Sequence, residues 1–145
     1  MIKRERLDIE CRARSAYSTK ISCELLSEKL VVGVNGPLHE FDIYAEGVVI
    51  GGVSTGTYNT SFGKTNTGAR DRACAELLWL SLWPGRESCV HILTDMPLAT
   101  WLLRRFGNAP FLKHIDIYHY DVAQDSLAKV GRIGEKAFSS GEFLV

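Results

Sequence analysis

The chain has 145 residues, of which 46% are hydrophobic, and this is enough to build one sizeable core without disulfides or metal staples. Seventeen basic and seventeen acidic residues cancel, so no global electric field draws the protein to nucleic acid or to a membrane. Binding of a polyanion would therefore need a local basic patch. We expect one domain over residues 1–145.

The cysteines and the hydropathy pattern indicate the compartment. The four cysteines lie far apart and form no Cys-x-x-Cys pair, which predicts buried, reduced thiols at Cys11, Cys23, Cys74 and Cys89. No apolar run follows the charged N-terminus, and the longest apolar stretch, Ala75 to Trp83, is too short to span a bilayer. We expect a cytoplasmic protein without a membrane partner.

The N-terminal third predicts a strand, a helix and a second strand. Residues 7–14 alternate apolar and charged side chains, which predicts a strand with one wet face within an extension over residues 1–14. Apolar residues between 17 and 30 follow helical spacing, with Ser15 or Ser18 available as the N-cap. Residues 30–34 are rich in β-branched side chains and end at the turn Asn35-Gly36-Pro37.

The next segment predicts a hairpin followed by a long loop. Residues 40–45 return from the Asn35-Gly36-Pro37 turn, reverse again at Glu46-Gly47 and continue as residues 48–55, which completes a meander of three antiparallel strands. Residues 54–68 contain five threonines, three glycines and two asparagines and are too polar to pack as an element. We expect a long mobile loop here, and such loops are usually functional or disordered.

The second half alternates helices and strands. The pattern predicts a core helix over residues 69–83, a strand over 89–94, a helix capped by Asp95 that ends near Phe106, and a strand over 115–120. A short helix over 122–130 and an unassigned tail from Ser139 complete the chain. This order predicts an α/β domain whose βαβ crossover makes two late strands parallel.

Between residues 17 and 120 the order resembles the PD-(D/E)XK, or restriction-endonuclease-like, superfamily, whose core is a helix, a three-strand meander, a helix and a strand. The matching positions are Glu24 in the first helix, Asp42 between Phe41 and Ile43, the strand Val49 to Ser54, and the segment His91 to Asp95 before a helix. The resemblance implies that an acid on each of two strands holds Mg²⁺, while a lysine two residues after the second acid activates water.

Only the first acid of that set is present. Asp42 matches it, whereas Gly52 and Ser54 occupy the positions of the second acid and the lysine. The sequence therefore predicts a catalytically degenerate nuclease-like domain that binds nucleic acid or a protein partner.

Some members of the superfamily recruit an acid from the following helix, which leaves an active enzyme as the alternative. In that alternative Asp42 and Glu76 hold Mg²⁺ and Lys64 replaces the missing lysine of a phosphodiester-cleaving nuclease. Arg70 and Arg72 are candidates for phosphate binding, because guanidinium groups suit the geometry of phosphate.

The register of the hairpin around Glu46-Gly47 tests this alternative. A two-residue turn at Glu46-Gly47 would place Asp42 opposite Gly51, and a three-residue turn would place it opposite Gly52, where a nuclease site needs it.

Each candidate also has a structural interpretation. Asp42 fits the wet face of an amphipathic strand, Glu76 fits a solvated ion pair with Arg72 four residues earlier, and Asp95 fits a helix cap.

Two further alternatives concern the fold and the assembly. A ribonuclease-H-like fold would use Glu46, Glu76 and Asp95 as its acids, but it places two strands between the first acid and the helix, where this sequence predicts one. An unpaired strand over residues 1–14 could also add to the sheet of a second copy, which would make the protein a structural homo-oligomer.

Overall fold

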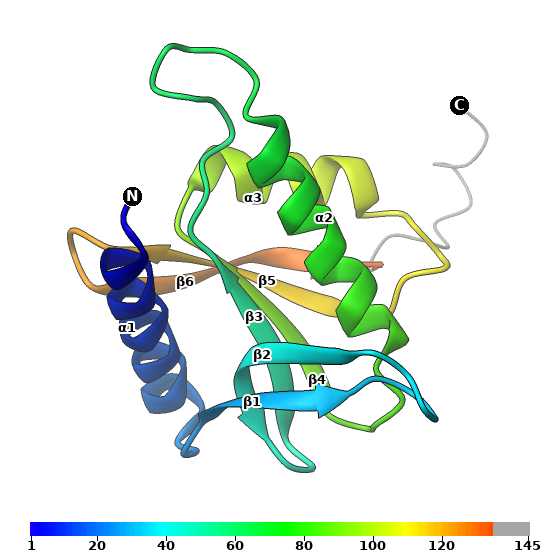
Figure 1. Ribbon diagram of the computed structural model, residues 1–145. Coiled ribbons are helices and arrows are strands. Elements are labelled where there is room, and N and C mark those ends of the chain that lie inside the picture. Colours follow the sequence, from blue (N-terminus) through cyan, green and yellow to red (C-terminus); the bar gives the residue numbers. More distant parts are fainter. Residues whose placement is uncertain (135–145) are drawn as a thin grey trace.

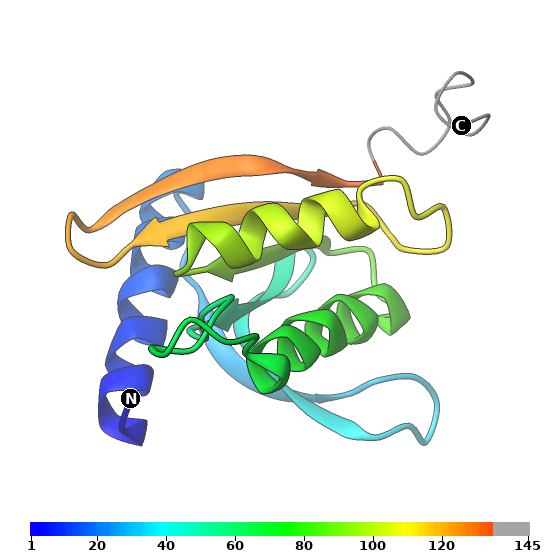
Figure 2. The same ribbon diagram turned by 90° about the horizontal axis from the view of Figure 1, so that it is seen from above.

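The computed structural model describes residues 1–134, whose helices and strands form three layers (Figures 1 and 2). Helix α1 covers one face of a sheet, and helices α2 and α3 cover the other. In chain order the elements are α1 (Lys3–Ile21), β1 (Leu26–Val31), β2 (Leu38–Ala45), β3 (Val49–Ser54), α2 (Thr67–Leu82), β4 (Ser88–Leu93), α3 (Met96–Phe106), β5 (Ile115–Asp121) and β6 (Ser126–Ile133).

The described strands form one mixed six-stranded sheet in the order β1-β2-β3-β4-β5-β6. The meander β1-β2-β3 is antiparallel, β3, β4 and β5 run parallel, and β6 returns antiparallel to β5. Strands β3 and β4 are buried on both faces, as expected for parallel strands between helical layers. The prediction of an α/β fold is confirmed.

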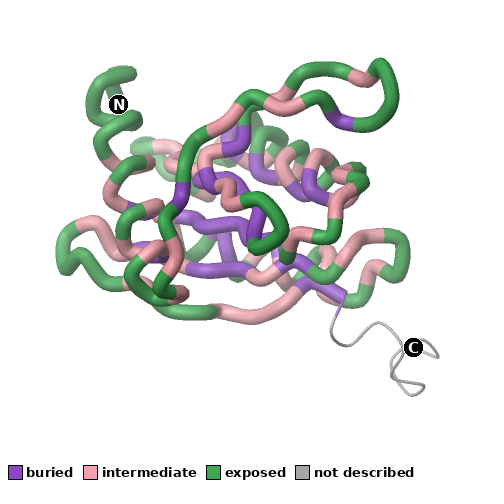
Figure 3. The backbone as a smooth tube through the Cα atoms, turned by 90° about the horizontal axis from the view of Figure 1, so that it is seen from below, coloured by how far each residue is buried: buried purple, intermediate pink, exposed green. Residues whose placement is uncertain are grey.

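A hydrophobic cluster lies on each face of the sheet. Buried residues gather at the centre of the molecule, and exposed residues lie in the outer loops (Figure 3). On one face Ala13 and Tyr17 of α1 pack on strand residues, and the rings of Tyr17 and Tyr118 meet edge to face at 5.3 Å. On the other face Leu77 of α2 and Leu102 of α3 pack with strand residues of the second cluster. Both helical layers are thus fixed to the sheet by apolar burial.

The predicted N-terminal strand over residues 7–14 is wrong, because this segment belongs to the 19-residue helix α1. The segment is rich in Glu, Arg, Leu and Ala, which favour helix, and Ala13 and Tyr17, four residues apart, dock one helical face on the sheet. Ser15 and Ser18, predicted as caps, lie inside the helix. The argument for homo-oligomerisation through an unpaired strand therefore no longer applies.

The helix predicted to follow Tyr17 ends earlier than expected. Ser22 adopts a left-handed conformation with φ of 54° and caps the C-terminus of α1. Strand β1 begins at Leu26, four residues before the predicted strand, so Leu26 and Leu30 belong to the sheet. Apolar spacing over this short stretch did not distinguish helix from strand.

The short helix predicted over residues 122–130 is also wrong. Asp121 Oδ1 accepts a hydrogen bond from Gln124 N–H at 3.1 Å, and Asp125 has a positive φ of 49°. These features reverse the chain in a tight turn, after which β6 pairs with β5. The tail from Ser139 lies outside the described residues.

The middle of the chain agrees with the prediction to within two residues for α2, β4, α3 and β5. Asp95 caps α3, since its carboxylate accepts a hydrogen bond from Leu98 N–H at 3.2 Å. The expected loop is shorter than predicted, because Asn66 caps α2 through Ala69 N–H and residues 67 and 68 are already helical.

The cysteines are free thiols, but only Cys89 is buried, which corrects the expectation that all four are. Among the helices of the described residues, none combines the length and apolar character needed to cross a membrane.

The docking of α1 can be tested with two substitutions on that helix. Tyr17→Ala removes a side chain that is 6% exposed and should lower the free energy of unfolding by about 3 kcal/mol. Leu7→Ala alters a side chain that is 47% exposed on the same helix and should change it by less than about 0.5 kcal/mol. Urea denaturation measures both, and equal losses would show that α1 does not pack on this face.

Candidate functional site

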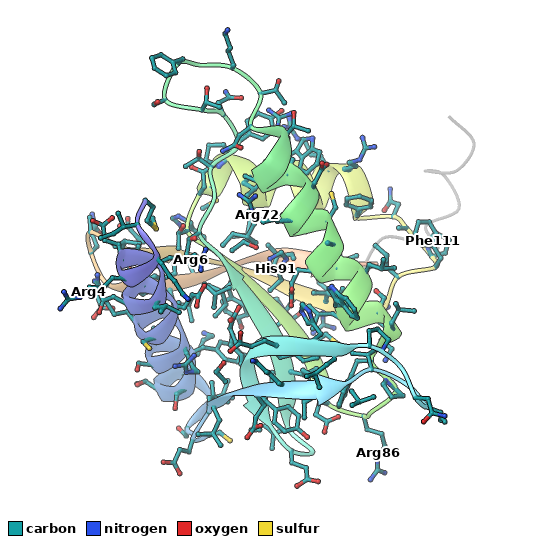
Figure 4. All side chains as sticks on the ribbon, in the orientation of Figure 1. Arg4, Arg6, Arg72, Arg86, His91 and Phe111 are labelled. Carbon is teal, nitrogen blue, oxygen red and sulfur yellow. The ribbon has the colours of Figure 1, made fainter. Side chains whose placement is uncertain are left out.

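A cleft lies between α1 and α2, above the end of β3 and beside β2. Seven of the residues that line it carry the chemistry discussed below: Arg6 and Glu10 from α1, His39 and Asp42 from β2, Ser54 from β3, and Arg72 and Glu76 from α2. Figure 4 shows Arg6 and Arg72 in the region between the two helices. Carboxylates and guanidinium groups therefore share one concave site.

Asp42 enters this cleft because β2 does not keep a regular alternation. The pairing of β1 with β2 shifts register between Leu26 and Glu28, opposite the middle of β2. Phe41 joins the core beneath α2 and α3, whereas Ile43 joins the core beneath α1. Asp42, between them, is partly buried, and its Oδ2 accepts a hydrogen bond from Val53 N–H at 2.8 Å. Asp42 is therefore partly sheltered in the wall of the cleft and not on a fully wet strand face.

The hairpin between β2 and β3 has a three-residue turn. Ala45 pairs with Val49 and Ile43 pairs with Gly51, and continuing this register by one residue sets Asp42 opposite Gly52. Of the two registers that the sequence allowed, this is the one that a nuclease-like site requires.

Glu76 of α2 lies directly against Gly52. A Cβ atom at Gly52 would overlap Oε1 and Cδ of Glu76, so the carboxyl group occupies the space that any larger residue at position 52 would need. Oε1 is buried and has no hydrogen-bond partner among the described residues. The Glu76 carboxyl group thus reaches the cleft that Asp42 lines.

His39 holds the other oxygen of Glu76. Its Nε2 lies 3.2 Å from Glu76 Oε2, in position to donate a hydrogen bond, and its ring stacks on Trp79 with centroids 4.4 Å apart. Phe41 contacts the His39 ring edge to face. Since the described residues contain no ion pair between Arg72 and Glu76, the predicted solvated pair on α2 is wrong.

Burial and neighbouring acids alter the ionisation of the carboxyl groups. Burial raises the pKa of Asp42 to about 7, with smaller contributions from the charges of Glu10, Glu76 and Glu40, while the Val53 N–H bond opposes the rise. Burial also raises the pKa of Glu10. Near neutral pH Asp42 is therefore close to its midpoint, a property common at functional sites.

Ser54, at the position where the resemblance expects lysine, contacts a buried histidine. Ser54 Oγ lies 2.7 Å from His91 Nε2, and His91 is completely buried with no partner for Nδ1 among the described residues. Burial lowers the pKa of His91 to about 4, so the ring is neutral at physiological pH. Residue 54 therefore contributes a hydroxyl group to the cleft instead of a positive charge.

The basic residues predicted for the site do not lie together in the structure. Arg72 lines the cleft, and the part of the chain that the structure describes contains no hydrogen-bond or ion-pair partner for its guanidinium group. Arg70 instead packs over the ring of Tyr58 at 3.5 Å and donates hydrogen bonds to Tyr58 and Asn59. Lys64 is exposed on the loop and does not line the cleft.

Sequence reasoning missed Glu10, His39 and His91. The resemblance pointed to Glu24 as the acid of the first helix, but Glu24 is exposed between α1 and β1, and Glu10 lies at the cleft. The helical spacing of Ala13 and Tyr17 could have located α1 and with it Glu10. No local pattern marks the two histidines, because their partners are 37 residues away in the chain.

The acids of the ribonuclease-H-like alternative do not meet. Glu46 is exposed in the turn between β2 and β3, and Asp95 caps α3 and accepts a bond from Tyr58 N–H at 2.9 Å. Only Glu76 of the three lines the cleft. Within residues 1–134, no group of three or more His, Cys, Asp or Glu side chains converges closely enough to hold a metal ion.

Comparisons with known proteins add no relative: no family model, no curated protein and no solved structure matches this chain.

The raised pKa of Asp42 predicts how stability depends on pH. Between pH about 4 and 7 the folded protein binds this proton more tightly than the unfolded chain, so stability falls as pH rises through that range. Asp42→Asn keeps an acceptor for Val53 N–H and removes the charge. In EDTA, its gain in unfolding free energy over wild type should be larger at pH 8 than at pH 5, by at most roughly 3 kcal/mol.

Urea denaturation at the two pH values measures this difference. Asp71→Asn, which removes an exposed carboxylate from α2, controls for the loss of one negative charge. A gain for Asp42→Asn that is the same at both pH values would contradict the assignment.

Proposed function

We propose that this protein is a divalent-cation-dependent nuclease of the PD-(D/E)XK-like type, in which Asp42 and Glu76 form the cation-binding pair. The observation that carries the proposal is the position of the Glu76 carboxyl group against Gly52. The resemblance assigns the second acid to position 52, and here a glutamate from α2 fills the space beside that glycine. The order helix, three-strand meander, helix and strand also supports the kinship.

The two carboxyl groups suit Mg²⁺ in number and kind. Magnesium is commonly bound by one or two carboxylates together with substrate phosphates and water, so a cluster of three protein ligands is not required. Glu76 Oε1, buried and without a hydrogen-bond partner among the described residues, is an acceptor that a cation would satisfy. When bound, such an ion lowers the pKa of water and neutralises charge on the phosphate.

The protein's own side chains then have separate roles. Arg72 offers two guanidinium N–H groups to a phosphodiester that enters the cleft. His39, packed on Trp79, orients Glu76 through Oε2 and leaves Oε1 toward Gly52. Asp42 contributes negative charge above pH about 7 and holds a proton below it, so cation binding and activity should rise through neutral pH.

A second candidate function is the binding of nucleic acid without cleavage. It is favoured by the position of Lys64 outside the cleft and by the presence of Ser54 where the resemblance expects lysine. The arginines and the cleft would then serve recognition alone.

Cleavage assays separate the two functions. Purified protein incubated with single- and double-stranded DNA and RNA in Mg²⁺ or Mn²⁺ should cut at least one substrate. Asp42→Ala should lower the rate by at least about 100-fold, the size typical of a positioned catalytic carboxyl group. Gel electrophoresis of labelled oligonucleotides measures the rate, and intact substrate under every condition would favour the binding function.

The position of Glu76 allows a sharper test by relocation. Glu76→Ala should reduce cleavage to the level of Asp42→Ala while opening the space beside Gly52. Adding Gly52→Glu to Glu76→Ala returns a carboxylate to this space from the strand and should restore cleavage by about 10-fold or more. Gly52→Glu alone should be impaired, because its side chain collides with Glu76.

Circular dichroism checks that each variant is folded. If folded Glu76→Ala cleaves like wild type, Glu76 is not part of the site.

A further inference from the structure

The segment between β3 and α2 contains a small, internally bonded hairpin. Asn59 and Thr65 form a β-bridge, Thr60 N–H donates to Lys64 O at 2.7 Å, and Gly63 N–H donates to Thr60 O at 2.9 Å. Gly63 has a φ of 75°, a conformation that glycine adopts without strain. The segment predicted as a mobile loop therefore has a defined turn at its tip.

The base of this hairpin is fixed to both helices beneath it. Asp95, at the start of α3, accepts a hydrogen bond from Tyr58 N–H at 2.9 Å. Arg70 of α2 covers the Tyr58 ring and donates to Tyr58 O and to Asn59 Oδ1, each at 3.0 Å. The hairpin is thus anchored at its base, so its tip projects in a set direction.

The tip presents an aromatic ring to solvent. Phe62 is 88% exposed and belongs to neither hydrophobic cluster of the described residues, and the neighbouring Lys64 is also exposed. The segment projects from the body of the molecule at the end where the N-terminus of α1 lies (Figure 1). The Phe62 ring thus packs in neither cluster of the described residues, and on a turn with an anchored base it is available to a partner.

Residues on either side of the hairpin line the cleft. Thr55 and Gly56 precede the hairpin, Ala69 and Arg72 follow it, and all four are cleft residues. Phe62 lies six residues beyond Gly56 and so at most about 20 Å from it. A ligand that fills the cleft and continues beyond its rim would reach the tip.

We propose that Phe62 stacks on an unpaired base of a single-stranded nucleic acid whose backbone enters the cleft. This inference rests on the proposed function and names its substrate class. Aromatic side chains bind single strands by stacking on bases of any sequence, while basic groups follow the phosphates. The cleft supplies such groups in Arg6 and Arg72, and the hairpin tip adds the exposed Lys64.

Shape favours a nucleic-acid strand over a membrane surface. The carboxyl groups of Asp42 and Glu76 lie inside the cleft, and a phosphodiester reaches them only as part of a narrow, flexible chain. A flat layer of lipid headgroups would meet Phe62 and Lys64 at the tip but would not enter the cleft. A single strand accounts for both the tip and the cleft.

Fluorescence anisotropy with labelled 12-nucleotide single strands of DNA and RNA tests the proposal. Ca²⁺ replaces Mg²⁺, and gels verify that the strands stay intact. Phe62→Ala should weaken binding about 5- to 100-fold, the range expected for the loss of one stacked base. Phe62→Tyr and Phe62→Trp keep a planar ring and should bind within about threefold of wild type.

Phe111→Ala is the matched control. Phe111 is also a highly exposed phenylalanine, at 78%, but it lies in the connection between α3 and β5 and does not line the cleft (Figure 4). This variant should bind like wild type. A blunt duplex offers no unpaired base, so its affinity should respond little to Phe62→Ala.

The possible failures are distinguishable. If wild type binds single strands and Phe62→Ala binds them as tightly as Phe111→Ala does, the stacking role is overturned and the proposed function stands. If wild type binds no oligonucleotide, both are overturned. Binding to vesicles of anionic phospholipid that requires Phe62, without oligonucleotide binding, would assign the tip to a membrane instead.

Discussion

The contact between Glu76 and Gly52 is the constraint on which the cleft depends. Because Gly52 has no side chain, α2 brings a carboxyl group against the backbone of β3, next to Val53, whose N–H donates a hydrogen bond to Asp42. Burying a second acid near Asp42 is costly, and the structure offsets part of this cost with bonds from Val53 N–H and His39. The remaining acceptor, Glu76 Oε1, stays unsatisfied among the described residues, which fits a site prepared for a cation.

The three-layer architecture explains how residues from distant parts of the chain meet. Helices α1 and α2 pack on opposite faces of the sheet, and the cleft opens between them where β2 changes the face to which its side chains point. A regular strand would have sent Asp42 to one helical layer only. The irregular pairing of β1 with β2 instead leaves Asp42 accessible from the space between the layers.

The nuclease proposal and the stacking inference draw on different parts of this arrangement. The first depends on the buried contacts around Glu76, and the second depends on an exposed hairpin anchored by Asp95 and Arg70. They meet where Thr55 and Gly56, at the start of the segment between β3 and α2, line the cleft. The two proposals name one kind of ligand, a flexible polyanion with planar bases.

The sequence by itself determined most of the local structure: the α/β class, the meander, the cap at Asp95, and the helices and strands from α2 to β5. These follow from turn residues, caps and apolar periodicity, which act over a few residues. It also identified Asp42, Glu76 and Arg72 as candidates. The N-terminal segment was assigned wrongly, because charged and apolar residues in alternation suit a strand as well as a helix with little buried surface.

Only the tertiary structure decided the hairpin register, the partial burial of Asp42, the approach of Glu76 to Gly52 and the position of Glu10, not Glu24, at the cleft. The physical reason is separation along the chain. His39 and Glu76 are 37 residues apart, as are Ser54 and His91, and such contacts arise from the packing of whole layers. Local sequence patterns do not predict which side chain will fill the space beside a glycine.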